Sequence, residues 1–282
     1  MLSGRAIYSN AAPSRPWAFL PELIRHREVL VRLVAKDLKV RYRYALIGFA
    51  WAVLEPLFLT LILAFVFTMV FDIRGEGTGI ESRGQYAAMI LVALIPWQFF
   101  SNGLSAAANS LVDNRSLIGK VRFMREVVPL SAIGVALVNF LIAYPVMLLV
   151  GFILMWGLPG VGALYLLAIF LIQVALVAGL GLLLACGNAY YRDISYMTGV
   201  ALTFLFYASP ILYLVDMVPQ SLYYFYMLNP MACLIEAYRF CLIENAMPSV
   251  QLLAWPATAA ALALGAGIVV FRRLAPNLAD QL

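Results

Sequence analysis

The longest uncharged stretch of the chain constrains its fold more than any other feature. Residues 127–191 contain no Asp, Glu, Lys or Arg over 65 positions. A membrane-spanning helix needs about 20 mainly apolar residues, so this stretch is long enough for two spans. Residues 157–160, which read Gly-Leu-Pro-Gly, supply a turn between them. The stretch therefore predicts a helical hairpin that crosses a lipid bilayer twice.

Further stretches of low charge occur along the rest of the chain. Of its 282 residues, 64% are hydrophobic and 12% are charged, whereas water-soluble domains carry about 25% charged residues. We therefore predict an all-α polytopic membrane protein, with one transmembrane domain over residues 45–272 between cytoplasmic tails at 1–21 and 273–282. The six predicted spans cover residues 45–71, 85–112, 127–156, 162–187, 194–215 and 248–271.

Residues 217–235 are also uncharged, but they are unsuited to a straight span. They contain Pro219 and Pro230 and the aromatic run 223–226. Tyr and Trp concentrate at the membrane–water interface, and irregular backbone inside a membrane is tolerated only where protein or water surrounds it. We interpret residues 217–244 as short re-entrant helices between spans five and six.

The distribution of basic residues supports this number of spans. Cytoplasmic segments of membrane proteins are enriched in Lys and Arg. With the N-terminus inside, the predicted cytoplasmic segments hold 16 of the 19 basic residues. An additional span at 217–235 would place Arg272 and Arg273 outside. The sequence therefore predicts a multi-pass protein of the cytoplasmic (inner) membrane with both termini in the cytoplasm.

Residues 22–44 combine a basic face with an aliphatic face. Basic side chains recur at helical spacing, and aliphatic side chains recur on the opposite side. The two sets are Arg25, Arg32, Lys36, Lys39 and Arg43, and Leu23, Leu30, Val34 and Leu38. Such an amphipathic helix lies in the membrane interface and is attracted by anionic lipid headgroups. It either frames a lateral opening for a lipid-linked substrate or serves only as a topological anchor, and the pattern fits both.

Residues 113–126 form the longest charged connection between predicted spans. The segment mixes basic residues with Leu117, Ile118, Val121 and Phe123. A short amphipathic helix here could insert into a groove on a cytoplasmic partner. The alternative is a solvated loop that only satisfies the charge bias of the cytoplasmic side.

Charge and metal-binding residues argue against several other classes of protein. The net charge of +5 does not indicate nucleic acid, because the basic residues flank the predicted spans. One histidine and three cysteines without a C-x-x-C pair give no metal site. The chain has no G-x-x-x-x-G-K-[ST] loop for ATP. We therefore expect no catalytic residue, metal or cofactor in this chain.

Several short segments share their order and spacing with one family of transporters. They read RYRY, LIGFAW and EPL within 41–57, IPWQFF at 95–100, NAYYRDI at 188–194, SPILY at 209–213 and LNP at 228–230, together with residues 114–125. These segments resemble the permease subunits of type-2 ABC exporters, above all those that export lipid-linked polysaccharides such as O-antigen, capsule and teichoic acid. One departure is Met124, where many relatives carry proline.

The resemblance implies a homodimer that works with two copies of a separate ABC ATPase subunit, which binds ATP and Mg²⁺. It identifies 113–126 as a coupling helix, and the residues expected to couple to the ATPase are Arg115, Lys120, Val121, Arg122, Phe123, Arg125, Arg192 and Asp193. The implied substrate is a polysaccharide linked to a polyprenyl diphosphate. Basic side chains favour such a diphosphate, and the candidates are Lys36, Lys39, Arg41 and Arg43.

Aromatic residues and one acid inside the spans are the remaining candidates. Aromatic rings stack on sugar rings, so they could line a path for a glycan, although an interfacial aromatic belt explains them equally. The candidates are Trp97, Phe100, Tyr207, Tyr213 and Tyr224. Glu55 is the one acid well inside a predicted span, and a carboxylate there is functional or paired. We expect Glu55 to have a structural role.

Three other functions remain as alternatives. An exporter of small lipophilic drugs or lipids is disfavoured by the tyrosine-rich outer region. A secondary transporter would show ionisable residues at mid-membrane and inverted repeats. A membrane enzyme acting on prenyl sugars would need clustered acids or histidines at one membrane face. We therefore predict the membrane subunit of an ATP-driven exporter of lipid-linked polysaccharide.

Overall fold

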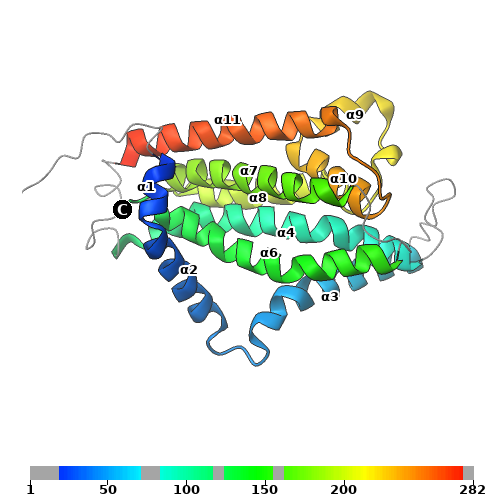
Figure 1. Cartoon of the computed structure of the whole chain (residues 1–282), viewed down its shortest axis with the longest axis horizontal. Coiled ribbons are helices and arrows are strands. Elements are labelled where there is room, and N and C mark those ends of the chain that lie inside the picture. The colour runs from blue at the N-terminus through cyan, green and yellow to red at the C-terminus, as the bar shows by residue number, and fades with distance from the viewer. Residues whose placement is uncertain (1–18, 71–82, 117–123, 155–161, 276–282) are drawn as a thin grey trace, which may run out of the picture.

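The computed structural model describes residues 19–70, 83–116, 124–154 and 162–275. All regular elements of this part of the chain are helical, and the long helices lie side by side in an elongated bundle (Figure 1). The elements are α1 (Phe19–Arg25), α2 (Arg27–Tyr42), η2 (Gly48–Ala50), α3 (Trp51–Phe65), η3 (Val66–Val70), α4 (Arg83–Asp113), α6 (Val127–Leu154), α7 (Ala163–Tyr190), α8 (Asp193–Tyr207), η4 (Val215–Met217), α9 (Gln220–Met227), α10 (Pro230–Leu242) and α11 (Val250–Leu274).

Five helical segments are long and apolar enough to cross a membrane. They cover Gly48–Met69, Arg83–Asp113, Val127–Val150, Leu164–Tyr190 and Val250–Leu274. Each agrees with a span predicted from the sequence, so the all-α polytopic membrane class is confirmed. The remaining predicted span, at 194–215, corresponds to the shorter helix α8 and stays a prediction.

The helix α8 ends earlier than the predicted span because of Ser209 and Pro210. Proline has no N–H to donate and disfavours helical backbone in the residue before it. The Ser209 hydroxyl donates back to the Leu205 carbonyl oxygen at 2.6 Å, and the side-chain amide of Asn229 donates to that hydroxyl at 2.9 Å. The chain therefore turns after Tyr207, and the turn is attached to the start of α10.

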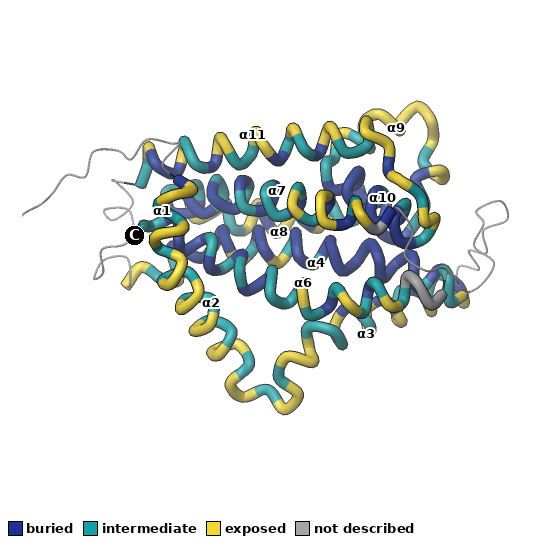
Figure 2. Tube along the Cα trace, viewed as in Figure 1, coloured by how far each residue is buried: buried dark blue, intermediate teal, exposed yellow. Residues whose placement is uncertain are grey.

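The helix α4 forms the centre of the bundle. Figure 2 shows it almost entirely buried, between α6 on one side and α7 on the other. The fully buried Gln173 of α7 donates to the Pro96 carbonyl oxygen at 2.7 Å and accepts from the Tyr238 hydroxyl at 3.0 Å. This one side chain therefore connects α4, α7 and α10 through hydrogen bonds that the apolar surroundings favour.

The short helices after α8 occupy one end of the bundle, and α1 lies at the other (Figure 1). Arg239 of α10 is fully buried and donates to the carbonyl oxygens of Ile211 at 3.1 Å and Tyr213 at 3.0 Å. The Arg239 guanidinium also forms an ion pair with the Glu236 carboxylate, at 3.7 Å. Two short helices are thus present where re-entrant helices are predicted, while their depth in a membrane stays a prediction.

The N-terminal region forms two helices where the sequence predicts one over 22–44. The break lies at His26, between α1 and α2. Beyond it α2 leans away from the bundle, and α2 and α3 form the arms of a V in Figure 1. Val34 on the inner face of α2 packs against α6 at Gly134, while the basic residues of α2 are exposed. The predicted separation of basic and aliphatic faces is therefore present in α2.

The helices α7 and α11 approach each other closely at two glycines. A Cβ atom at Gly179 would overlap the backbone of Ala263 and Leu264, and one at Gly267 would lie 2.5 Å from the Gly179 carbonyl oxygen. Small residues at such crossings allow the van der Waals contact that drives helix association in lipid.

This crossing predicts that two Gly→Ala substitutions differ in their effect on stability. Gly179→Ala is expected to lower the free energy of unfolding by about 1–3 kcal/mol, because the backbones must separate. Gly265→Ala on α11 is the matched control, since nothing lies within 4 Å of its added methyl group. Thermal unfolding of the purified protein in detergent measures both. Equal midpoints for the two variants would contradict the tight crossing.

Candidate functional site

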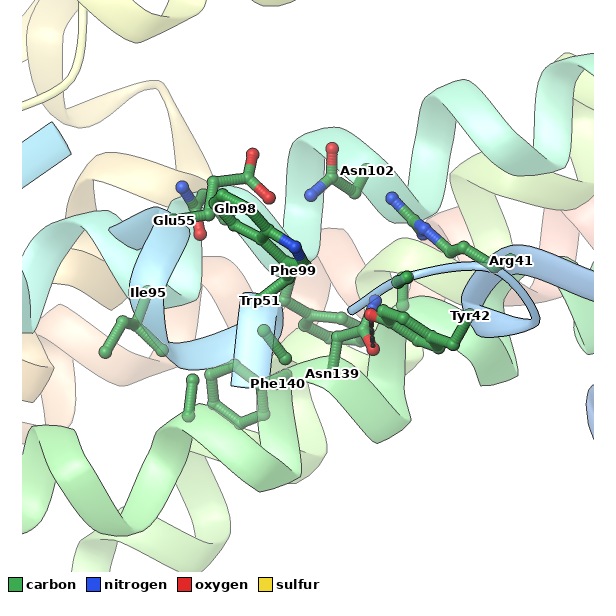
Figure 3. A pocket seen from close by; sticks show the side chains of 14 residues that line it. Arg41, Tyr42, Trp51, Glu55, Ile95, Gln98, Phe99, Asn102, Asn139 and Phe140 are labelled. Carbon is green, nitrogen blue, oxygen red and sulfur yellow. Dashed lines mark hydrogen bonds between the residues drawn. The ribbon is translucent and has the colours of Figure 1, made fainter. Parts of the chain in front are cut away.

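A cavity of about 220 Å³ opens where α2 and α3 diverge from the bundle. We call it the polar cavity, because its lining includes several charged and amide side chains (Figure 3). These polar residues are Arg41, Tyr42, Glu55, Gln98, Asn102 and Asn139. They come from α2, α3, α4 and α6, so four segments that are distant in sequence contribute to one site.

Helix geometry explains how the amides reach this cavity. Gln98 and Asn102 are four residues apart on α4 and therefore project from the same face. Asn139 of α6 accepts a hydrogen bond from the Tyr42 hydroxyl at 2.9 Å, which connects the end of α2 to the bundle. The buried rings of Phe99 and Phe140, with centroids 5.3 Å apart, form an apolar floor.

Glu55 is exposed and faces the polar cavity (Figure 3). In the described part of the chain no basic side chain forms an ion pair with it. Pro56, the next residue, is buried within α3. The carboxylate of Glu55 is therefore exposed in the single chain, and its predicted structural role stays a prediction.

The four basic residues predicted to bind a diphosphate lie along the exposed side of α2 and just after it. Lys36 is 3.1 Å from the Asp37 carboxylate and 3.5 Å from the Asn114 side-chain oxygen. Lys36, Lys39 and Arg43 line a second hollow of about 720 Å³ beside α2, whereas Arg41 points into the polar cavity. The structure thus divides the predicted set between two hollows, and Tyr42 lines both of them.

The residues predicted to couple to an ATPase fall into three groups. Lys120, Val121, Arg122 and Phe123 lie outside the described residues. Arg115, Arg192 and Asp193 are exposed. Their helices meet nearby, because the Ser195 hydroxyl donates to the Asn109 side-chain oxygen at 2.8 Å. The guanidinium of Arg125 donates to the Ala275 carbonyl oxygen and so joins the start of α6 to the end of α11.

Beside Arg125, a charge cluster joins α1, α11 and the residue that precedes α6. Arg272 of α11 lies 2.6 Å from the Glu22 carboxylate of α1 and 3.3 Å from the Glu126 carboxylate. Its guanidinium also lies 5.6 Å from the centre of the Phe19 ring. Burial raises the pKa of the Glu126 carboxyl, and the charge of Arg272 opposes this shift. The cluster holds both ends of the described chain at the same end of the bundle.

The predicted aromatic residues separate into buried and exposed groups. Trp97 and Phe100 are buried, and Trp97 packs edge-on against Phe206 with centroids 5.7 Å apart, so neither lines a surface of the single chain. Tyr207 and Tyr224 are exposed. The Tyr213 hydroxyl donates to the Tyr207 carbonyl oxygen at 2.8 Å and so helps to close the turn after α8.

Comparison with known proteins identifies the family. Residues 28–243 match the family described as ABC-2 type transporter. The chain belongs to this family. Over 264 residues it is 29% identical to an O-antigen export system permease protein RfbA of Myxococcus xanthus, and this similarity covers 93% of the chain and 98% of the relative. A protein of the same name from Klebsiella pneumoniae is 30% identical over 220 residues, which cover 75% of this chain and 79% of the relative.

The match confirms the predicted resemblance to type-2 ABC permeases and makes this chain a multi-pass membrane transport subunit. Within the described residues, no three His, Cys, Asp or Glu side chains gather so that they could hold a metal ion.

Sequence reasoning missed two features of this ABC-2 transporter. The amides of the polar cavity could have been found, because Gln98, Asn102 and Asn139 lie inside otherwise apolar spans. The charge cluster could not be predicted from the sequence, because Glu126 and Arg272 lie at span ends, where charged residues are common.

The charge cluster predicts different consequences for two adjacent arginines. Arg272→Gln is expected to lower the free energy of unfolding by about 3–5 kcal/mol, because two partly buried carboxylates then face each other unpaired. Arg273→Gln is the matched control, since Arg273 is exposed. Thermal unfolding of both purified variants measures the difference, and Arg272→Leu combined with Glu126→Leu should recover part of the loss. An Arg272→Gln variant as stable as Arg273→Gln would refute the role of the cluster.

Proposed function

We propose that this chain is the transmembrane subunit of an ATP-driven exporter that moves a lipid-linked polysaccharide of the O-antigen class across the cytoplasmic membrane. The observation that carries this proposal is the similarity to an O-antigen export permease over 93% of this chain and 98% of that relative. A match over nearly the full length of both chains leaves little room for a different architecture.

The proposed topology has six crossings with both termini in the cytoplasm. Its support is the contact between Glu22 and Arg272, which holds α1 next to the last turn of α11. An even number of crossings follows if both elements lie on the same side of the membrane. The helix α8 and the turn after it supply the sixth crossing. Its 15 helical residues extend about 22 Å, so the turn and the start of α10 complete the passage across about 30 Å.

The proposed assembly contains two copies of this chain and two ATPase subunits, which bind ATP and Mg²⁺. The core of one described chain is filled: Ile90, Leu94 and Ala107 of α4 are fully buried. A hydrated path for a glycan therefore has no place among these closely packed helices and is expected between two copies.

In the proposed mechanism, the ATPases grip residues 113–126 and displace them when they close on ATP. In the sequence this segment lies between the end of α4 and the start of α6. The contacts of Arg125 with Ala275 and of Glu126 with Arg272 would carry the displacement on to α11 and α1. The movement would thus reach the amphipathic region, where Lys36, Lys39, Arg41 and Arg43 are proposed to receive the diphosphate of the substrate.

The coupling role predicts the effect of reversing two charges. Lys120→Glu combined with Arg122→Glu is expected to reduce co-purification of the ATPase at least tenfold and to abolish export. Arg83→Glu is the control, because Arg83 begins α4 at the end opposite to residues 113–116. The measurements are the ATPase content of the purified complex and the polysaccharide on the cell surface. Undiminished co-purification and export in the double variant would exclude the coupling role.

The function itself is tested in cells that lack this chain. They are expected to lose surface polysaccharide and to accumulate the lipid-linked polymer on the cytoplasmic side, and a plasmid copy should restore export. Surface polysaccharide at wild-type levels without the chain would contradict the proposed function.

A further inference from the structure

We propose that the polar cavity binds the first sugar of the substrate, the ring attached directly to the lipid diphosphate. This inference rests on the proposed function and names the part of the substrate that one site recognises. It assigns the site to Glu55, Gln98, Asn102 and Asn139, with Arg41 at one end (Figure 3).

Three polar side chains of the cavity have hydrogen-bonding groups without a protein partner in the described residues. Gln98 lies midway along α4, inside a segment long and apolar enough to span a membrane. In the described structure no side chain or backbone group forms a hydrogen bond with the side chain of Gln98, Asn102 or Glu55. Polar groups at this depth are costly and mark substrate paths. The two amides donate and accept, and the carboxylate accepts. Sugar hydroxyls do both, so a sugar ring can satisfy all three side chains.

The distribution of charge orients the substrate. Arg41 and Tyr42 lie at one end of the polar cavity, and Glu55 lies with Gln98 at the other (Figure 3). A diphosphate is attracted to the guanidinium and repelled by the carboxylate. The diphosphate therefore belongs near Arg41, and a neutral ring that donates hydroxyl groups belongs near Glu55.

Size and apolar surface fit one ring. The volume of about 220 Å³ is below the range of about 300–1,000 Å³ for sites that enclose drug-sized ligands. The half-exposed indole of Trp51 and the rings of Phe99 and Phe140 give flat apolar surfaces for the C–H face of a pyranose. A longer stretch of glycan does not fit, so the site binds the first sugar rather than the repeat unit.

The lipid tail has a place beside the cavity. The diphosphate joins the prenyl tail to the sugar, so the tail must leave the cavity at the Arg41 end. The chain that follows α2 has exposed apolar side chains there, among them Leu46, Ile47 and Phe49. A prenyl chain can lie against this segment in the bilayer, so that tail, diphosphate and sugar keep their covalent order from this segment past Arg41 to Glu55.

The test compares two lipids in nanodiscs that hold the full-length chain. The probes are undecaprenyl diphosphate and undecaprenyl diphosphate carrying one N-acetylglucosamine. The wild type is expected to bind the glycosylated lipid about tenfold tighter than the bare lipid. Gln98→Met and Asn102→Leu should each reduce this preference about 3- to 10-fold, the effect of one hydrogen bond. Thr203→Val on α8 is the control, since Thr203 is exposed and far from the cavity lining.

Glu55→Gln is expected to change the affinities for the two lipids differently. Removing the negative charge is expected to strengthen binding of bare undecaprenyl diphosphate and to weaken the preference for the sugar. The substitution hardly changes side-chain size, and the thermal midpoint of each variant verifies that it is folded. Arg41→Gln should weaken binding of both lipids.

The outcomes separate the two proposals. If the wild type binds neither lipid, the proposed function fails. If it binds both without preference, or keeps its preference in Gln98→Met, Asn102→Leu and Glu55→Gln, the sugar site is wrong while the proposed function stands. If zwitterionic phospholipid in the nanodisc abolishes the preference, the cavity holds an ordinary lipid headgroup and the sugar site is again overturned.

Discussion

The fold depends on hydrogen bonds that polar side chains of one helix donate to backbone carbonyls of another. Apolar helices gain little from the hydrophobic effect against each other once they are surrounded by lipid, so packing and such hydrogen bonds must hold them together. Gln173 and Asn188 of α7 both donate to α4, at the carbonyls of Pro96 and Ala108. Arg239 does the same for the turn after α8. These few polar groups select one arrangement among helices whose apolar surfaces are otherwise alike.

Hydrogen-bond partners also distinguish the polar groups that stabilise the fold from those that are free to bind a substrate. Gln173 and Arg239 are buried and have protein partners, so they belong to the framework. Glu55, Gln98 and Asn102 lie beside a cavity without such partners in the described residues. A transporter must bind a polar headgroup within an apolar bundle, and only groups left unpaired by the fold can do this. The charge cluster around Arg272 is of the first kind, and its position next to residues 113–126 connects the framework to the proposed point of coupling.

The sequence predicted the parts of the structure that follow from periodicity and composition. Long uncharged runs gave five spans within a few residues, and the residue pattern at 41–57 and 188–194 gave the family. The helix α8 ends at Tyr207, eight residues before the end of the predicted span. An apolar run does not reveal that the Asn229 side chain hydrogen-bonds Ser209 just after this helix end. The exposure of Glu55 in the single chain could not be predicted, because burial depends on which helix packs beside it. Arg41 is predicted to act with Lys39 and Arg43, and this stays a prediction. The structure places Arg41 in a different hollow from the other two, and a one-dimensional pattern does not show where the helix leans.

We propose that this chain exports a lipid-linked glycan only together with an ATP-hydrolysing partner. The most direct measurement reconstitutes the purified chain and its ATPase in liposomes with a fluorescently labelled lipid-linked glycan on the outer leaflet. A membrane-impermeant glycosidase then reports how much glycan is protected inside. The account predicts protection that appears with ATP and Mg²⁺ and is absent when either the ATPase subunit or ATP hydrolysis is removed. Equal protection by the chain alone, without any nucleotide, would contradict it.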